Sequence, residues 1–234
     1  MCATGAKAKG PERLYRVGAA CLGWRMTGPI LCFGDSNTYG TPPMRVRGGG
    51  DRFGREVRWP ARLAALTGRE VIEEGLPGRT ACGGADPEMG AHMDGPLGLR
   101  IALQSHGPID RLIVMLGTND LKAHFGRGPE AIAAGIATLL QIAVSDDMQA
   151  RHGGFSTLLV CPPPILETGV LAALFLGGAE TSNALWPHCR ALAEAHGVAA
   201  LEAGAHIESS AVDGIHLEPG AHARLAEVVA EALG

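Results

Sequence analysis

The chain alternates short, wholly apolar runs with longer segments in which apolar residues recur every three or four positions. Aliphatic runs of about five residues are typical of strands buried on both faces, and the longer period is typical of amphipathic helices. Regular alternation of the two predicts βαβ units that build a parallel sheet. Five strands are predicted, at residues 30–34, 70–74, 111–116, 156–161 and 198–202.

Helical periodicity lies between these strands and after the last one. Helices are predicted at residues 59–66, 129–144, 183–196 and 219–233, and Pro129 suits the first turn of the second helix. No internal repeat or shift in composition divides the chain. The pattern therefore predicts a single α/β domain over residues 28–234.

Two segments interrupt the alternation. Residues 41–55 contain two prolines and three consecutive glycines, and residues 81–96 are also rich in glycine and proline. Both are predicted to be long loops that follow strands. Because open α/β sheets bind ligands at the carboxyl ends of their strands, we expect these loops to be functional.

Composition narrows the class of protein. The 234 residues are 46% hydrophobic and 19% charged, as expected for a globular domain, and the formal net charge is −4. Basic residues are scattered, so no nucleic-acid partner is predicted. No apolar stretch reaches about 18 residues, and no membrane association is predicted. The six cysteines form no C-x-x-C pair, which favours free thiols in a reducing cytoplasm and no metal site.

Residues 1–27 loosely imitate a signal peptide, because four basic residues precede an apolar run at residues 17–24. The run is short, contains two glycines, and has no small-x-small cleavage site before Arg25. We therefore expect residues 1–27 to be a flexible extension, or to result from an upstream assignment of the start codon, with Met26 as the alternative start.

A nucleophile candidate follows the first predicted strand, in residues 33–38 (FGDSNT). Serine is a weak nucleophile at neutral pH and needs a neighbouring base, which a third group orients. Gly34 permits a tight turn, and the backbone N–H of Ser36 can then point at a developing oxyanion. The alternative is an ordinary helix N-cap cluster of short polar residues.

A base candidate lies just before the last predicted helix, in residues 212–217 (VDGIHL). Asp213 and His216 are three residues apart, so one turn can place the carboxylate beside the imidazole Nδ1 while Nε2 faces the serine. The alternative is a turn in which Asp213 bonds its own backbone and His216 is half-exposed.

Two further strand ends offer oxyanion donors. Gly75 follows the second strand with an N–H that could face a bound ester, and Asn119 follows the third with a side-chain amide. Each alone could be an ordinary turn. The candidate nucleophile, the two donors and the base nevertheless lie in successive predicted loops, and this order favours a catalytic site.

These blocks, Gly-Asp-Ser, a strand-end Gly, Gly-Thr-Asn-Asp and Asp-Gly-Ile-His, resemble those of the SGNH (GDSL-like) hydrolases across residues 30–233. The resemblance implies a flavodoxin-like three-layer α/β/α sandwich with strand order 2-1-3-4-5. It also implies a Ser36, His216, Asp213 triad and an oxyanion hole made by Ser36, Gly75 and Asn119. No cofactor is implied.

Further runs, among them residues 51–53 (DRF) and 57–59 (VRW), resemble the bacterial arylesterase and acyltransferase branch of that family. By this resemblance a homo-oligomer is expected, as large as an octamer. Asn37 stands where the common motif has leucine, at a position that we interpret as outside the chemistry. Substrate contacts are expected from Asp35, Tyr39, Thr41, Trp59 and Lys122.

Tyr39 and Thr41 replace tryptophans of the related acyltransferase, so a wider and wetter pocket is expected, which disfavours acyl transfer in water. Trp59 is equally consistent with a core position, and Lys122 with a solvated loop. The sequence thus predicts a cytoplasmic serine esterase that acts on small, short-acyl esters, with acyl transfer as an additional activity. The alternative is a catalytically silent module that binds an acylated carbohydrate or a partner protein. A nucleotide-binding protein is disfavoured because residues 34–36 form neither G-x-G-x-x-G nor a P-loop.

Overall fold

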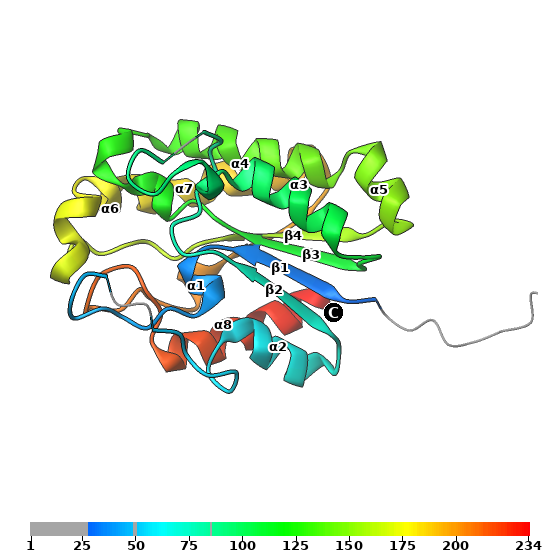
Figure 1. Cartoon of the computed structure of the whole chain (residues 1–234), viewed down its shortest axis with the longest axis horizontal. Helices are drawn as coiled ribbons and strands as arrows, with labels where there is room; N and C mark the ends of the chain where they lie inside the picture. The colour runs from blue at the N-terminus through cyan, green and yellow to red at the C-terminus, as the bar shows by residue number, and fades with distance from the viewer. Residues whose placement is uncertain (1–27, 49–50, 85) are drawn as a thin grey trace, which may run out of the picture.

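A five-stranded parallel sheet organises this computed structural model, which describes residues 28–48, 51–84 and 86–234. The strand order β2-β1-β3-β4-β5 confirms the order that the family resemblance implies (Figure 1). Each predicted strand is present, with ends that differ by at most one residue. The strands are β1 (Ile30–Gly34), β2 (Val71–Gly75), β3 (Arg111–Met115), β4 (Ser156–Cys161) and β5 (Ala199–Glu202).

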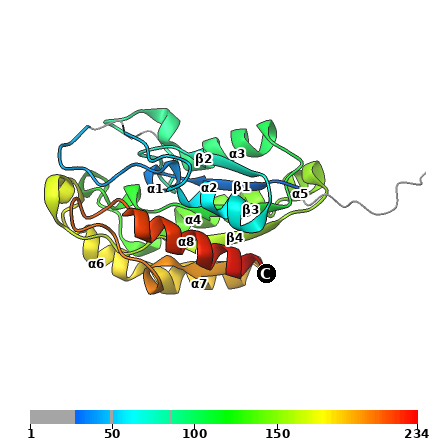
Figure 2. The same cartoon turned by 90° about the horizontal axis from the view of Figure 1, so that it is seen from below.

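Helices cover both faces of the sheet. One face carries α3, α4, α5 and α7, and the other carries α2 and α8 (Figures 1 and 2). The α-helices are α1 (Ser36–Tyr39), α2 (Trp59–Thr67), α3 (Gly95–Ser105), α4 (Pro129–Ala143), α5 (Asp146–His152), α6 (Gly178–Asn183), α7 (Leu185–His196) and α8 (Pro219–Leu233). Short 3₁₀ helices are η1 (Ala91–Met93), η2 (Asn119–Leu121), η3 (Ala123–Phe125), η4 (Gly169–Phe175) and η5 (Ala203–Ala205).

The central strands are apolar on both faces because each face has its own core. In β1, Leu31 and Phe33 belong to the core beneath α3, α4 and α7, whereas Ile30 and Cys32 belong to the core beneath α2 and α8. Alternate residues of a strand point to opposite faces, so a run buried on both sides contains no polar position. This explains the uninterrupted aliphatic runs in the sequence.

The helices differ from the prediction mainly in number. The helix predicted at residues 183–196 corresponds to α7, which begins two residues later, whereas α3, α5 and α6 were not predicted. Helix α3 begins with a glycine and a proline, which read as loop residues, yet Pro96 stands near the helix start, where its missing N–H costs nothing. The side chain of Asp94 caps this helix by accepting the N–H of Leu97 at 2.8 Å.

The prediction of a flexible extension, and the alternative of a start at Met26, concern residues 1–27 and so lie outside the described residues. Across residues 28–48, 51–84 and 86–234, no single helix is long and apolar enough to cross a membrane. Helices α4 and α5, which are bent by 49° relative to each other, together meet that criterion by length and composition only.

Candidate active site

The predicted nucleophile lies on a tight turn directly after β1. Asp35 caps α1 by accepting the N–H of Asn37 at 2.9 Å, and Ser36 is the first residue of that helix. A side chain at Gly34 would overlap Thr38, so only glycine permits this turn. Because the first N–H groups of a helix have no intrahelical acceptor, the N–H of Ser36 remains available to a ligand. Ser36 is 6% exposed.

Asp213 and His216 form the predicted pair. The Asp213 Oδ2 atom lies 2.6 Å from Nδ1 of His216, and both residues are almost fully buried. Oδ1 accepts the backbone N–H groups of Ile215 and His216, each at 3.0 Å. The carboxylate therefore bonds its own turn and also orients the imidazole, but His216 is 4% exposed rather than half-exposed as the alternative interpretation had it.

A third segment holds the same carboxylate. The N–H of Met44, in the long loop after α1, donates to Asp213 Oδ2 at 2.7 Å. Burial alone would raise the pKa of Asp213, but the hydrogen bonds from the His216 ring, the His216 N–H and the Met44 N–H lower it to about 2. The carboxylate is therefore ionised at neutral pH, and it keeps the proton on Nδ1 so that Nε2 can act as a base.

Asn119 lies in η2, directly after β3, and is 6% exposed. Its side-chain Nδ2 donates to the carbonyl oxygen of Arg79 at 3.1 Å and lies 3.5 Å from Asp35 Oδ2. The second distance is at the outer limit for a hydrogen bond, so one amide hydrogen is only weakly engaged. That hydrogen can turn to a developing oxyanion in the pocket.

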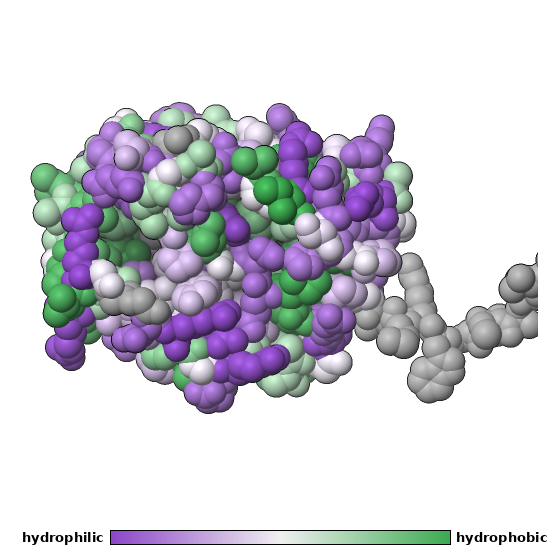
Figure 3. All heavy atoms as spheres, viewed as in Figure 1, coloured by the Kyte–Doolittle hydropathy of each residue, from purple (hydrophilic) through white to green (hydrophobic). Residues whose placement is uncertain are grey.

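Ser36, Asn119 and His216 line one pocket of about 290 Å³. It opens at the carboxyl ends of the strands, beside α6, where hydrophobic residues gather on the surface (Figure 3). Its wall is mainly apolar. The apolar lining residues are Met44, Pro77, Met89, Leu171, Leu174, Phe175 and Ile215.

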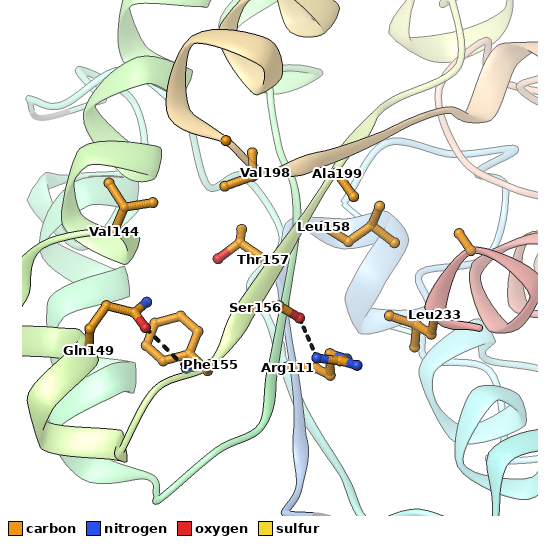
Figure 4. A pocket seen from close by; sticks show the side chains of 12 residues that line it. Arg111, Val144, Gln149, Phe155, Ser156, Thr157, Leu158, Val198, Ala199 and Leu233 are labelled. Carbon is orange, nitrogen blue, oxygen red and sulfur yellow. Dashed lines mark hydrogen bonds between the residues drawn. The ribbon is translucent and has the colours of Figure 1, made fainter.

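A second cavity, of about 380 Å³, lies at the opposite end of the sheet, where β3, β4 and β5 begin (Figure 4). Arg111 is the single ionisable residue that lines it, and its guanidinium donates to Ser156. The residues that line this cavity include no nucleophile paired with a base, in contrast to those of the Ser36 pocket.

Comparisons with known proteins agree with this geometry. The profile of the GDSL-like Lipase/Acylhydrolase family matches residues 32–224. The chain belongs to this family. No curated protein sequence matches it significantly.

Solved structures of esterases share the fold over most of the chain. A carbohydrate acetylesterase from Sinorhizobium meliloti is 35% identical, covers 88% of this chain and 98% of its own, and superposes with a TM-score of 0.83. The native aryl esterase of M. smegmatis is 36% identical, with the same coverage and TM-score. A second S. meliloti protein, a carbohydrate acetylesterase family member, is 32% identical over 89% of this chain and 100% of its own, with a TM-score of 0.77. The chain is therefore an ester hydrolase of the GDSL-like acylhydrolase family.

Gly75, the second oxyanion donor expected for this acylhydrolase, is placed differently from that expectation. The N–H of Leu76 donates to the carbonyl oxygen of Gly34, and successive N–H groups of a strand point to opposite sides. The N–H of Gly75 therefore points away from β1, and Gly75 does not line the Ser36 pocket. A side chain at Gly75 would overlap the backbone of Tyr39, so close packing of β2 against α1 explains this glycine.

Gly78, three residues further on, lines the pocket. Its φ is +96°, in the region that favours glycine, and no acceptor among the described residues takes its N–H. Gly78 was not identified from the sequence because the oxyanion donor was assigned to Gly75, the glycine nearest the end of the strand.

Of the expected substrate contacts, four lie outside the Ser36 pocket. Asp35 is a buried helix cap, and burial raises its pKa to about 6 although the Asn37 N–H and the charge of His216 oppose the shift. The Arg52 guanidinium lies 4.3 Å from the centre of the Tyr39 ring. Thr41 lines a separate cavity of about 200 Å³, and Trp59 is in the core beneath α2 and α8.

Lys122 does line the pocket, as expected. Its side chain is 5% exposed, and Nζ donates to Asp86 Oδ2 at 2.9 Å and lies 3.5 Å from the Met89 sulfur. Burial would raise the pKa of Asp86, but Lys122 and the N–H groups of Glu88 and Met89 lower it below its usual value. The pair thus fixes the turn that carries Met89 against Gly78, and it neutralises the charge that Lys122 brings to the pocket wall.

Both long loops predicted to be functional reach the pocket. Residues 41–55 supply Met44, Arg47 and Gly48, and residues 81–96 supply Glu88 and Met89. Arg47 and Glu88 pair at 3.4 Å with both side chains more than half exposed. The wall formed by η4 had no sequence signal. Within the described part of the chain, no group of three or more His, Cys, Asp or Glu side chains is placed to hold a metal ion.

Proposed function

We propose that the protein is a serine carboxylic-ester hydrolase that forms an acyl-enzyme on Ser36. The observation that carries the proposal is the buried Asp213–His216 pair, joined at 2.6 Å, whose histidine lines the same pocket as Ser36. A nucleophile, its base and the group that orients the base are the three parts that acyl transfer through serine requires.

The first half of the reaction forms the acyl-enzyme. Nε2 of His216 accepts the proton of the Ser36 hydroxyl as Oγ attacks the ester carbonyl carbon, and the carbonyl electrons move onto oxygen. The bond to the alcohol oxygen then breaks, and the imidazolium returns its proton to that oxygen. In the second half, water gives a proton to His216 and attacks the acyl carbon; the acyl–Oγ bond then breaks, and the imidazolium returns the proton to Ser36 Oγ as the acid leaves.

Three donors hold the oxyanion in this proposal: the N–H groups of Ser36 and Gly78 and the amide of Asn119. The first two are supported by backbone N–H groups without an acceptor beside the pocket. One such donor is typically worth about 10²–10³ in rate. The role first assigned to Gly75 passes to Gly78 because only the latter lines the pocket.

The substrates that suit the pocket are esters of short acyl chains with aryl or otherwise apolar alcohols. The cavity, of about 290 Å³, is small, and methionine, leucine and phenylalanine side chains form most of its wall. A sugar would need several polar partners, whereas Lys122 is already paired with Asp86. The apolar wall favours the aryl esterase over the carbohydrate esterase as a guide to specificity.

The same apolar wall also favours a second outcome, in which an alcohol or peroxide replaces water as acceptor. Transfer requires the acceptor to reach the acyl-enzyme before water does, and a dry wall helps. Tyr39 and Thr41 lie outside the pocket lining, so the expectation of a wetter pocket loses its basis.

The decisive experiment compares the wild type with Ser36→Ala. The wild type should hydrolyse p-nitrophenyl acetate and be labelled at Ser36 by a fluorophosphonate, and the variant should lose both properties, with kcat lower by at least about 10³. Folded wild-type protein that is neither active nor labelled would instead indicate a silent binding module.

Chain-length preference is tested with p-nitrophenyl esters from acetate to decanoate. We expect kcat/KM to fall as the acyl chain lengthens, because the small pocket cannot bury a long chain. Rates that rise with chain length would contradict the short-acyl proposal without affecting the assignment of Ser36.

A further inference from the structure

The backbone of Ile215 and His216 is fully hydrogen-bonded, and one of its bonds leaves the loop. Both N–H groups go to Asp213, and the carbonyl oxygen of His216 accepts the N–H of Ser210 at 2.8 Å. The remaining group, the carbonyl oxygen of Ile215, accepts Nδ2 of Asn37 at 3.1 Å. Three of the bonds therefore shape the loop, and the fourth ties it to α1.

Asn37 is the neighbour of the nucleophile. It is 1% exposed, and its own N–H is held by Asp35. Its Nδ2 must face Ile215 because a carbonyl oxygen can only accept, which leaves the buried Oδ1 without a partner among the residues that the structure describes. A leucine here would fill similar space but donate nothing, so the amide has a role beyond packing.

We infer that Asn37 is a positioning residue that sets the distance between the nucleophile turn and the histidine loop. The inference rests on the proposed function, since it assumes that Ser36 and His216 react together. Asn37 and Ile215 are 178 positions apart in the chain, and among the described residues their bond is the single direct hydrogen bond between residues 35–40 and residues 210–217.

The need for such a tie follows from geometry. Proton transfer from Ser36 to His216 requires approach to hydrogen-bond distance, and a misplacement of about 1 Å can cost 10²-fold in rate. The Asp213–His216 pair orients the ring, and the Met44 N–H holds its carboxylate, but neither contact joins the histidine loop to α1 itself. The hydrogen bond of Asn37 connects that loop to α1. This role replaces the interpretation that residue 37 lies outside the chemistry.

The test uses Asn37→Leu, Asn37→Ala and the isosteric Asn37→Asp, which sets an acceptor against the Ile215 carbonyl. We expect kcat/KM for p-nitrophenyl acetate and the rate of fluorophosphonate labelling to fall together by about ten- to hundredfold in all three. The midpoint of the acid limb of the pH profile should stay unchanged in the leucine and alanine variants, because the Asp213–His216 bond is intact.

Gln149→Leu provides the matched control. Its side-chain amide also bonds backbone groups, those of Ala143 and Phe155, but at the opposite end of the sheet (Figure 4). This variant should lower thermal stability as much as the Asn37 variants do and leave both rates unchanged. Folded Asn37→Leu and Asn37→Ala proteins with wild-type rates would overturn the inference. Activity that persists in Ser36→Ala would overturn the proposed function instead, so the two failures are distinguishable.

Discussion

At the residue scale, the most constrained group of the site is the carboxylate of Asp213. It accepts four hydrogen bonds, from the His216 ring and from the N–H groups of Met44, Ile215 and His216. These bonds stabilise the charged form, and the pKa of about 2 follows although burial acts in the opposite direction. The carboxylate thus stays ionised wherever the histidine can act as a base.

The sign of the resulting pH dependence is fixed by the direction of the shift. Since the folded-state pKa lies below the ordinary value of 3.8, the contribution of Asp213 to stability is complete above about pH 4. It is lost as the pH falls towards 2. An acid limb of activity observed above pH 4 therefore does not belong to Asp213.

We predict that Asp213→Asn keeps the fold but lowers kcat by about 10³–10⁴, because an amide can favour the wrong histidine tautomer. The measurement is kcat for p-nitrophenyl acetate, together with the rate of fluorophosphonate labelling. Asp94→Asn, which alters a helix-capping carboxylate bonded to Gly84 and Leu97, is the control and should keep kcat. A loss below tenfold in Asp213→Asn would contradict the prediction.

At the scale of elements, helices α2 and α8 are joined by an unusual cap. Arg58, at the N-cap of α2, makes no side-chain hydrogen bond that caps the helix, and Nδ1 of the fully buried His222 on α8 accepts the N–H of Trp59 at 3.3 Å. Only a neutral imidazole can accept. Burial first, and then the charges of His216, Arg58 and Arg62, lower the pKa of His222 to about 4.

This cap predicts acid sensitivity. A histidine with a folded pKa near 4 and an ordinary value of 6.5 contributes stability that is complete above pH 6.5 and lost as the pH falls towards 4. His222→Gln can still accept the hydrogen bond but does not titrate. We predict that this variant makes the drop in Tm over this pH range smaller, by on the order of 5 °C, than it is in the wild type. Thermal unfolding between pH 4 and 7 measures it.

The control for this prediction is His196→Gln, at the C-terminal end of α7, where the histidine is partly exposed and distant from α2. It should keep the wild-type slope of Tm against pH. If His222→Gln shows that same slope, the assignment of acid sensitivity to the α2–α8 cap is wrong.

The helices and strands differed in how well the sequence predicted them. The central strands β1, β3 and β4 were readable because burial on both faces leaves a nearly continuous apolar run. Helix α3 was not, because its Gly95 and Pro96 are typical of loops until Asp94 is known to cap them. Helix η4 gave no periodic signal, because it is a 3₁₀ helix of seven residues and its wall residues reach the pocket through contacts that only folding creates.

At the scale of the whole molecule, the site is made by strand order. Ser36 follows β1, Gly78 follows β2, Asn119 follows β3, and His216 comes after β5, so parallel pairing brings four distant segments to one edge of the sheet. The expected homo-oligomer remains a prediction, which sizing chromatography at low concentration would contradict by returning a monomer.

The contribution of the N-terminal residues is predicted from the same arrangement. Every residue of the proposed site lies within residues 36–216, and the esterase structures align over 98% of their own length to 88% of this chain. A chain that starts at Met26 should therefore keep kcat/KM and Tm within error of the full chain. The control removes residues 1–31 and cuts into β1, which should abolish folding. A large loss of activity on starting at Met26 would assign residues 1–25 a role in the site.

The sequence by itself determined the strands, the nucleophile turn and the Asp-x-x-His pair, because these depend on local pattern and on residues at most a few positions apart. It also marked both long loops that supply the pocket. Tertiary structure alone decided that Gly78 rather than Gly75 faces the pocket, since the direction of an N–H depends on which strand its neighbour bonds. It likewise decided that Tyr39, Thr41 and Trp59 lie away from the substrate, and that Asn37 reaches a carbonyl group 178 positions along the chain. Contacts of that kind have no local signal, because packing selects them only once the sheet has formed.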